Sequence, residues 1–357
     1  MTLPELGWCD AFEEAFRLHA EAGLLPARVV AHHRGGYRIV TPSGEFQAEV
    51  SGRFRHQTRQ TSDYPVVGDW VAMGMAPDGN RAVIQAVLPR RTKFSRNAAG
   101  DATEEQMLAA NIDLVFIVES LAQSLNTRRI ERYLALAWES GAQPVVLLTK
   151  SDLCEHLQTE VTRGVAAAGG VPVHAVCSLT GQGMDAVLPH LGVGCTAVLL
   201  GPSGVGKSTL VNHLAGEEVQ WVLPVRETDQ KGRHTTTHRE LIPLPRGGFI
   251  IDTPGLRELQ LWDAAEGVSE SFADIEELAR QCRFTNCLHD EEPGCAVTRA
   301  IGDGNLDGAR LESFRKLARE AEHFERRHDA RARADERRRW KGIAKSLRVH
   351  KKNRGKD

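Results

Sequence analysis

One octapeptide restricts the possible folds of this chain more than any other feature. Residues Gly201–Ser208 read GPSGVGKS and fit the pattern GxxxxGK[ST] at every fixed position. An apolar run at 196–200 precedes the octapeptide, and a helix is expected after it, over Thr209–Ala215. In that context the glycines let backbone N–H groups surround phosphates, and the helix N-terminus adds its dipole. The pattern predicts a phosphate-binding loop in which Lys207 neutralises β- and γ-phosphate charge and Ser208 ligates Mg²⁺.

Strand-like and helix-like segments alternate around this loop. Residues 128–140 have helical spacing, and buried strands are predicted by apolar runs at 112–120, 144–150, 171–176 and 196–200. Strands that alternate with helices predict a parallel sheet with helices on both faces. We therefore expect a P-loop domain of the α/β class.

A second phosphate-side element follows the loop. Asp252-Thr253-Pro254-Gly255 comes directly after the apolar run GGFII and matches the DxxG element of GTPases. In that element the Asp holds Mg²⁺ through water, and the Gly N–H contacts the γ-phosphate. It lies 44 residues after Ser208, which leaves room for a first switch segment.

A candidate base-reading element precedes the loop. Residues 149–152 read TKSD and resemble the guanine-reading NKxD element, with Thr149 where Asn is usual. Asp152 would accept the two donors on the guanine edge, and Lys150 would lie over the base. Adenine presents an acceptor there, so buried polar groups would be left unpaired and adenine rejected. The replacement of Asn by Thr149 puts the hydrogen bonds of the usual amide in question.

The order of these elements differs from that of ordinary Ras-like GTPases, in which the phosphate loop comes first. Residues 177–181, CSLTG, resemble the weak SAK-type element, whose backbone at Ser178 would contact guanine O6, although a plain strand-to-loop turn explains them nearly as well. Both base-reading elements therefore precede the phosphate loop and DxxG. A circular permutation leaves strand adjacency unchanged, so the same sheet is expected. It also places the second switch beside the C-terminal part of the chain.

The N-terminal part has a different pattern. Residues 1–26 predict a short, mostly helical lead-in, and five strand-like runs separated by turn residues follow, at 27–33, 37–42, 46–54, 69–73 and 82–88. Five short strands in so few residues predict a small barrel of the OB-fold type. Residues 88–100 are predicted to be a linker. Four arginines lie on or near these strands, and an RNA-facing surface and a solvated face explain them equally well: Arg38, Arg53, Arg55 and Arg59.

Three of the seven cysteines lie close together with a histidine. The spacing is Cys282-x4-Cys287-x-His289-x5-Cys295, which gives four ligands within 14 residues. The N-terminus has no basic stretch followed by an apolar one, so we expect a cytosolic chain, in which clustered cysteines favour a metal over disulfides. Cys₃His is a closed, tetrahedral set for structural Zn²⁺, so one zinc ion per chain is expected. The other four cysteines are predicted to be unpaired.

The formal net charge of −2 is the sum of two unlike parts. From Arg326 onward there are 14 Lys and Arg against 4 Asp and Glu, whereas the preceding residues are acidic overall. A basic tail of this kind binds nucleic acid through phosphate contacts, and a solubilising tail is the alternative. No apolar run reaches the length of about 20 residues needed to cross a bilayer. We therefore expect a cytoplasmic chain with no membrane partner.

Together these features resemble the ribosome small-subunit-dependent GTPase A (RsgA) family of circularly permuted GTPases. The resemblance covers residues 27–325 and includes the segments AANIDLVFIVES, GRHTTTHRE and CRFTNCLHDEEPGC. It implies a GTPase that acts late in assembly of the 30S subunit, is stimulated by that subunit, contacts 16S rRNA and cycles between GTP and GDP. We expect it to act as a monomer.

The source of hydrolysis is not obvious from the motifs. Leu256 follows DTPG, where Ras-like enzymes commonly use a nearby Gln to orient water. His234 lies in the expected first switch. Histidine side chains ordinarily have a pKa near neutrality, which suits the positioning of water, and a solvated loop histidine is the alternative interpretation. Thr235 or Thr236 would supply the Mg²⁺-sensing hydroxyl, and the family resemblance favours Thr236. That resemblance also favours His234 as the catalytic group.

The predicted architecture is a multidomain α/β protein: a 1–26 extension, a 27–92 OB-fold barrel, a 93–265 circularly permuted GTPase domain, a 266–325 helical zinc domain and a 326–357 basic tail. The magnesium ligands would be Ser208, Thr236 and Asp252. The residues predicted to bind nucleotide are Thr149, Lys150, Ser151, Asp152, Cys177, Ser178, Gly201, Pro202, Ser203, Gly204, Val205, Gly206, Lys207, Ser208, Thr209, Thr235, Thr236, Asp252 and Gly255.

Two other functional classes fit parts of the pattern. One is an RNA-binding scaffold whose nucleotide site only senses GTP against GDP. The other is a P-loop kinase or ATPase, which TKSD at the base-reading position disfavours. Hydrolysis stimulated by 30S particles separates the enzyme from the scaffold, and competition by ATP against GTP tests the base assignment.

Overall fold

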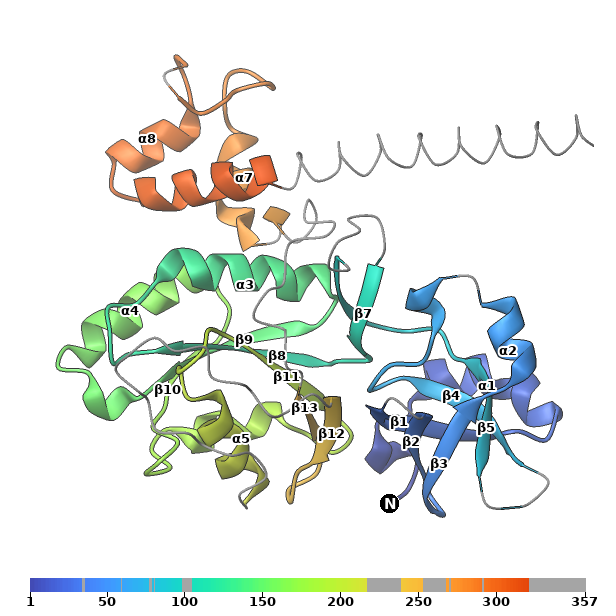
Figure 1. The fold of residues 1–357 in the computed structure, drawn as a ribbon. Coiled ribbons are helices and arrows are strands. Elements are labelled where there is room, and N and C mark those ends of the chain that lie inside the picture. The colour runs from blue at the N-terminus through green and yellow to red at the C-terminus, as the bar shows by residue number, and fades with distance from the viewer. Residues whose placement is uncertain are drawn as a thin grey trace, which may run out of the picture.

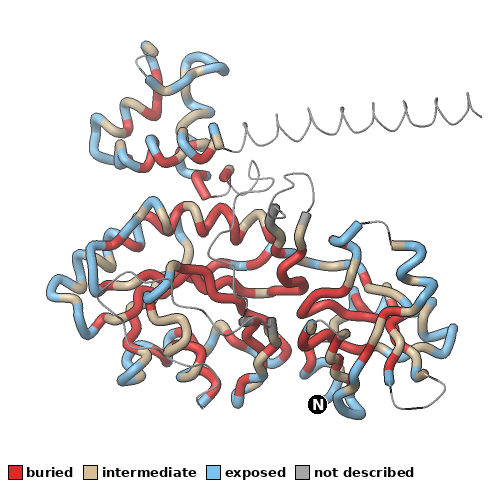
Figure 2. The backbone as a smooth tube through the Cα atoms, in the orientation of Figure 1, coloured by how far each residue is buried: buried red, intermediate tan, exposed pale blue. Residues whose placement is uncertain are grey.

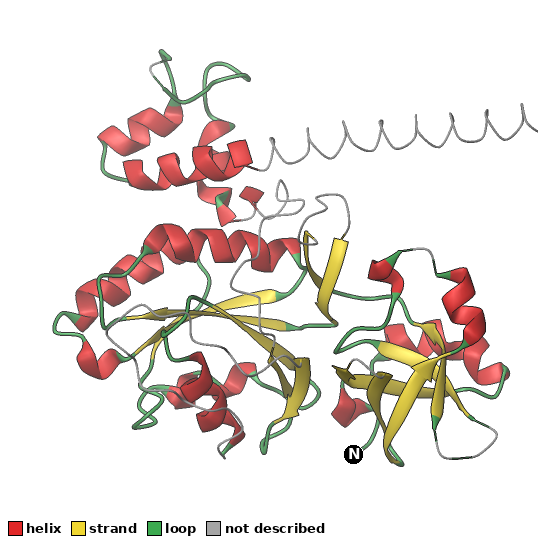
Figure 3. Cartoon of the chain, viewed as in Figure 1, coloured by secondary structure: helices red, strands yellow, loops and turns green. Residues whose placement is uncertain are grey.

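A computed structural model describes residues 1–33, 36–58, 60–76, 79, 81–97, 105–216, 239–252, 268–269, 271–290 and 292–320. Three bodies are visible in Figure 1: a small β-structure at the N-terminal end, a larger α/β body, and a helical module above it. In Figure 3 the first two bodies contain both strands and helices, whereas the third contains helices and loops. None of the helices within these ranges is long and apolar enough to cross a membrane.

The N-terminal strands form the predicted OB-type barrel. They are β1 (Leu25–His33), β2 (Gly36–Thr41), β3 (Gly44–Val50), β4 (Trp70–Met75) and β5 (Ala82–Val87). Their order is β1-β2-β3-β5-β4, and β4 pairs back with β1, so the barrel closes. Alternate side chains of the strands fill its interior, among them Val29, Ile39, Val71 and Ile84.

The helical lead-in packs on this barrel. It consists of a 3₁₀ turn, η1 (Pro4–Leu6), and helix α1 (Asp10–Glu21). Phe12 and Phe16 of α1 are buried, and the ring of Trp8 meets that of Trp70 edge-on at a centroid distance of 4.7 Å. Burial of these aromatic rings attaches the lead-in to one end of the barrel.

Two predictions about this region are wrong in part. The run predicted as one strand through residue 54 ends at Val50, and α2 (Gly52–Gln57) follows, because Ser51 caps it by accepting the amide N–H of Phe54. A 3₁₀ turn, η2 (Thr61–Asp63), lies beyond α2. The predicted linker at 88–100 contains β6 (Lys93–Asn97), which pairs antiparallel with β7 (Glu105–Ala110). Buried Phe94 and Met107 give this hairpin an apolar face that a linker would lack.

The α/β body has the predicted parallel sheet. Its strands are β8 (Leu114–Ser120), β9 (Gln143–Thr149), β10 (Val173–Ala175), β11 (Thr196–Leu200), β12 (Arg239–Pro243) and β13 (Phe249–Asp252). The order is β10-β9-β8-β11-β13-β12, and all neighbours are parallel except β12 and β13. Figure 2 shows that the central strands β8, β9, β11 and β13 are buried along most of their length.

Helices cover both faces of this sheet. Helices α3 (Thr127–Glu139) and α4 (Leu157–Ala168) lie on one face, and α5 (Lys207–Ala215) lies on the other (Figure 1). The short 3₁₀ turns η3 (Ser151–Leu153), η4 (Met184–Ala186) and η5 (Leu188–His190) connect the strands. This arrangement confirms the prediction of a doubly covered parallel sheet.

Strand β12 joins the two bodies. It pairs antiparallel with β13 on one side and with β1 of the barrel on the other, where Ala31 faces Glu240. Arg38 of β2 forms ion pairs with Glu240 and Glu45. Arg38 therefore belongs to the junction between the bodies, whereas Arg53 and Arg55 are exposed on α2. Arg59 lies outside the described residues.

A buried arginine reinforces this junction. Arg28 of β1 donates to the carbonyl of Leu6, to the Thr196 hydroxyl at 2.6 Å and to the Asn111 carbonyl at 3.4 Å. Its burial lowers the pKa to about 10, which still leaves it charged at neutral pH. The lead-in, the barrel and the start of β11 are thus held by one side chain.

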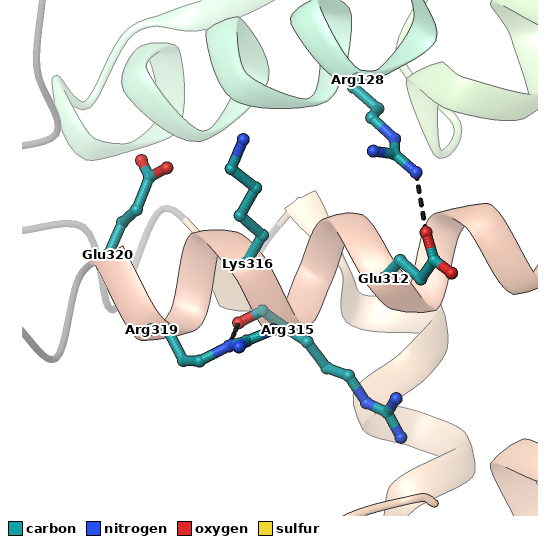
Figure 4. A pocket seen from close by; sticks show the side chains of 6 residues that line it. All are labelled: Arg128, Glu312, Arg315, Lys316, Arg319 and Glu320. Carbon is teal, nitrogen blue, oxygen red and sulfur yellow. Dashed lines mark hydrogen bonds and ion pairs between the residues drawn. The ribbon is translucent and has the colours of Figure 1, made fainter.

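The C-terminal module is helical, as predicted. It contains α7 (Ala273–Ala279), α8 (Ala296–Gly302) and a helix over residues 308–320. Arg310 is buried against the α/β body, where it pairs with Glu131 of α3 at 3.2 Å and with Asp274 of α7 at 2.8 Å. Arg128 and Glu312 form a further pair across the gap between α3 and this helix (Figure 4).

Candidate nucleotide and metal sites

The predicted phosphate loop connects β11 to α5. Gly201 begins the loop where an added Cβ would lie 2.3 Å from the carbonyl oxygen of Val118, so only glycine fits there. The backbone of Gly206 is left-handed, with φ of 99°, and α5 begins at the next residue, Lys207. The amino group of Lys207 donates to the carbonyls of Gly201 and Pro202, both at 2.6 Å. The loop therefore curls around its own lysine at the N-terminus of a helix, which is the form an anion-binding loop takes.

The TKSD segment contacts this loop directly. The Thr149 hydroxyl lies 2.5 Å from the carbonyl oxygen of Val205 and 3.0 Å from that of Glu119. The amino group of Lys150, whose backbone is left-handed, donates to the carbonyl of Gly204 at 2.8 Å. The structure thus brings the predicted base-reading element and the predicted phosphate loop together.

Each of the two predicted base-reading segments contains a buried hydroxyl without a partner among the described residues. Ser151 Oγ and Ser178 Oγ are buried, and neither has a hydrogen-bond partner within the described part of the chain. The backbone of Ser151 bonds to Val176, so the two base-reading segments are neighbours. The Asp152 side chain is exposed to solvent. Because buried hydroxyls are ordinarily satisfied, a polar ligand at this place would supply the partners that the hydroxyls of Ser151 and Ser178 lack.

A buried carboxylate outside the predicted motifs supports this edge of the sheet. Glu119, at the end of β8, is buried and forms two hydrogen bonds with Arg129 of α3, at 2.5 and 2.6 Å. These bonds raise the pKa of Arg129. The backbone carbonyl of Glu119 is also one of the acceptors facing Thr149. The apolar run at 112–120 contains two charged residues, Asp113 and Glu119, and this was the available indication in the sequence.

The other predicted nucleotide residues divide into two groups. Asp252 ends β13, next to the strand that carries the phosphate loop, and its backbone alone is described. Ser203, Ser208 and Thr209 lie in the loop and the first turn of α5, and Cys177 is buried beside Ser178. The remaining predicted residues lie outside the described ranges: His234, Thr235, Thr236 and Gly255.

The Cys/His cluster is assembled as predicted. The four ligand atoms of Cys282, Cys287, His289 and Cys295 all lie within 4.8 Å of one another. The Cys282 and Cys295 sulfurs are 3.8 Å apart, and each is 3.5–3.6 Å from His289 Nδ1. A tetrahedral ion with bonds of about 2.3 Å to sulfur and about 2.0 Å to nitrogen requires separations of about 3.8 and 3.5 Å. The cluster therefore fits a tetrahedral metal ion.

The environment of the cluster favours thiolate at Cys295 but not at Cys287, whose pKa is raised to about 11, with burial the largest cause. Burial opposes ionisation of Cys295, but hydrogen bonds, with those from Thr298 foremost, outweigh it and lower the pKa to about 6. His289 adopts a left-handed backbone, with φ of 61°, which turns its ring toward the sulfurs. Thiolate is the form that ligates metal.

The sheet order, the phosphate loop and the preceding base-reading loops define a circularly permuted P-loop GTPase. A family model described as RsgA GTPase matches residues 87–262. The chain is 47% identical to the small ribosomal subunit biogenesis GTPase RsgA of Opitutus terrae, over all of both chains. It is 48% identical to the protein of that name from Streptomyces coelicolor, over 95% of this chain and 92% of the relative. The chain belongs to the RsgA GTPase family.

Solved structures agree with this assignment. The crystal structure of YjeQ from Thermotoga maritima matches with a TM-score of 0.63 at 26% identity, over 84% of this chain and 98% of that one. The structure of YloQ, described as a circularly permuted GTPase, matches with a TM-score of 0.62 at 26% identity, over 84% of this chain and 96% of that one. The enzyme class, a GTP hydrolase, follows from this membership.

Proposed function

We propose that this protein hydrolyses GTP during late maturation of the small ribosomal subunit and that docking to the 30S particle stimulates the reaction. The observation that carries the nucleotide assignment is the contact of Thr149 and Lys150 with the phosphate loop. This contact supports a nucleotide site in which the proposed guanine-reading segment lies next to the proposed phosphate-binding loop. The names of relatives, small ribosomal subunit biogenesis GTPases, support the biological role.

Each residue of the site has a role in this proposal. Backbone N–H groups of residues 201–208 and the amino group of Lys207 bind the phosphates, and Lys207 exchanges its loop carbonyls for phosphate oxygens. The carboxylate of Asp152 would accept the guanine donors, and the buried, unpartnered hydroxyls of Ser151 and Ser178 are proposed to bond to the same ligand. Rejection of adenine follows from the buried polar groups it would leave unpaired.

Separate residues are proposed for Mg²⁺ and for hydrolysis. Ser208, Asp252 and Thr236 are the proposed residues for Mg²⁺, which would offset charge on the β- and γ-phosphates. His234 is the proposed residue that positions water, because Leu256 has no polar group for that task. A single zinc ion held by the Cys₃His cluster would brace the C-terminal module, whose own core is small.

Contacts to rRNA are proposed for three parts of the chain: the barrel, the C-terminal module and the basic tail. The exposed Arg53 and Arg55 of α2 support a contact from the barrel. We propose that the protein acts in the cytoplasm as a monomer with no membrane partner.

Phosphate release from GTP, measured with and without purified 30S particles, tests the proposal. We expect slow turnover alone and a large increase with 30S. Absence of any increase would favour a nucleotide-sensing scaffold instead. In parallel, ATP should fail to displace GTP. Effective displacement by ATP would contradict the guanine assignment and favour a P-loop ATPase or kinase.

A further inference from the structure

A buried carboxylate lies at the end of the strand that separates the two loops of the proposed nucleotide site. In the sheet, β8 lies between β9, which leads into the base-reading segment, and β11, which leads into the phosphate loop. Ser120 of β8 is opposite Thr149, and Ile117 is opposite Leu200, the last residue before the loop. Glu119 lies between these two positions on β8 and is 1% exposed. A charged group is therefore buried close to both loops.

This end of β8 is also a topological switch point of the sheet. The chain continues from β8 into α3 on one face and from β11 into α5 on the opposite face (Figure 1). In open α/β sheets such a divergence leaves a crevice outside the carboxyl ends of the two strands, and ligands bind there. Glu119 ends β8 next to this point, and its partner Arg129 lies in the first turn of α3. The pair is thus beside the expected position of the nucleotide.

The backbone that carries Glu119 contacts both loops. The carbonyl of Glu119 accepts a hydrogen bond from the Thr149 hydroxyl at 3.0 Å, and the same hydroxyl lies 2.5 Å from the carbonyl oxygen of Val205. The carbonyl oxygen of Val118 faces Gly201, where an added Cβ would lie 2.3 Å from it. A displacement of the end of β8 would therefore change the contacts of both loops.

Arg129 fixes the side chain of Glu119. Its Nε and Nη2 atoms donate to the two carboxylate oxygens at 2.5 and 2.6 Å, a bidentate geometry that lysine cannot provide. These are the hydrogen bonds of this carboxylate within the part of the chain that the structure describes. A buried carboxylate that loses its cation is an uncompensated charge in an apolar environment, so the end of β8 would move to expose it to water.

We propose that Glu119 and Arg129 are positioning residues of the nucleotide site: their ion pair holds the end of β8, and through it Thr149, so that both loops bind one nucleotide. The inference rests on the proposed function, because it assigns the two loops to the same guanine nucleotide. Neither side chain has to touch the nucleotide. The pair acts on affinity, and hydrolysis is assigned to other groups.

The test uses the full-length chain and measures its affinity for a fluorescent GDP analogue, together with KM and kcat for GTP in the presence of 30S particles. Arg129→Met removes the donors and should weaken GDP binding by about 5- to 50-fold, within the range of coupling between residues of one network. Arg129→Lys keeps the charge without the bidentate geometry and should give an intermediate affinity.

The kinetic constants separate positioning from a loss of folded protein. KM for GTP should rise in Arg129→Met while kcat changes by less than about 2-fold, because the lost interaction contributes equally to the ground state and the transition state. A smaller folded fraction would lower kcat and leave KM unchanged.

Arg132→Met is the matched control. Arg132 lies one turn further along α3, its side chain is 37% exposed like that of Arg129, and it pairs with Glu320 of the C-terminal module at 3.4 Å. Its replacement should leave GDP affinity unchanged. Thermal unfolding and the number of GDP sites per chain show whether each variant is folded. If Arg129→Met does not fold, Arg129→Lys and the near-isosteric Glu119→Gln take its place, and both should weaken GDP binding.

A double-mutant cycle tests the route through Thr149. Arg129→Met should weaken GDP binding less in a Thr149→Val background than in the unaltered chain, because the valine has already removed the hydroxyl that connects β8 to the phosphate loop. Additive effects of the two substitutions would contradict this route.

Three results would overturn the positioning role: unchanged GDP affinity in a folded Arg129→Met variant, a loss confined to kcat, and additivity with Thr149→Val. In each case GDP binding and 30S-stimulated hydrolysis by the unaltered chain would leave the proposed function in place. An unaltered chain that binds no guanine nucleotide would instead overturn the proposed function, and this inference with it.

Discussion

The hydroxyl of Thr149 lies 2.5 Å from the carbonyl oxygen of Val205, and this contact joins the base-reading segment to the phosphate loop. The same hydroxyl lies 3.0 Å from the carbonyl of Glu119. Thr149 has a single donor hydrogen, so the two carbonyls share it. Thr149 thus connects the end of β8 to the phosphate loop through one hydroxyl.

Removing that hydroxyl should weaken nucleotide binding. Thr149→Val keeps the shape but leaves the Val205 carbonyl without its donor, at a cost of about 0.5–1.5 kcal/mol. We expect affinity for GDP to fall by about 2- to 10-fold, measured by titration with a fluorescent GDP analogue. Thr149→Ser retains the donor and should bind like the unaltered chain. An unchanged affinity in the valine variant would show that the contact does not support the pocket.

The buried Arg310 should be the main electrostatic attachment of the C-terminal module. Arg310→Met leaves the buried Glu131 without its cation, and breaking a buried pair in this way typically costs about 3–5 kcal/mol. Urea unfolding should show earlier loss of the C-terminal helices. Arg280→Met is the control, because the Arg280–Glu277 pair is shorter, at 2.8 Å, but exposed, and should contribute at most about 1 kcal/mol. Equal effects of the two substitutions would contradict this assignment.

The ion pair between Arg310 and Asp274 predicts a loss of stability in acid. Burial opposes ionisation of Asp274, but its bonds to Arg310 outweigh burial and hold the pKa below its ordinary value. A lowered carboxyl pKa stabilises the fold above the unfolded-state pKa, and this contribution is lost as pH falls through the folded-state value. The stability difference between the unaltered chain and Asp274→Asn should therefore be present at neutral pH and shrink below about pH 4. A difference independent of pH would exclude this linkage.

Metal removal should unfold the C-terminal module selectively. Metal analysis should find one zinc ion per chain, and Cys282→Ser or a strong chelator should remove it. We expect the thermal transition of this module to fall while GDP binding persists, because the cluster is separate from the phosphate loop. Cys154→Ser, at a cysteine outside the cluster, should retain the metal. Full zinc content in Cys282→Ser would refute the ligand assignment.

His234 is predicted to act in hydrolysis and not in binding. His234→Ala should retain GTP affinity and lose 30S-stimulated phosphate release, by about 10²- to 10⁴-fold if the residue acts in proton transfer or water positioning. His19→Ala, on α1 and away from the nucleotide site, serves as the control. If stimulated turnover survives in His234→Ala, another group must perform this function.

The sequence alone determined the features that are local in the chain. The phosphate loop and the Cys₃His cluster are each contained within 14 residues, so their spacing limits their geometry. Alternation of strands and helices likewise predicted the sheet, and five short runs predicted the barrel. These patterns succeed because side-chain period and turn chemistry act between near neighbours.

Tertiary structure alone decided how distant segments meet. Thr149 and Val205 are 56 residues apart, Arg28 and Thr196 are 168 apart, and Arg310 and Glu131 are 179 apart. Strand β12 and the hairpin of β6 and β7 also depend on partners supplied by the fold, as do the unpartnered hydroxyls of Ser151 and Ser178. These pairings and contacts depend on which segments become neighbours after the chain packs. The local spacing of residues does not determine that, so the sequence pattern could not predict them.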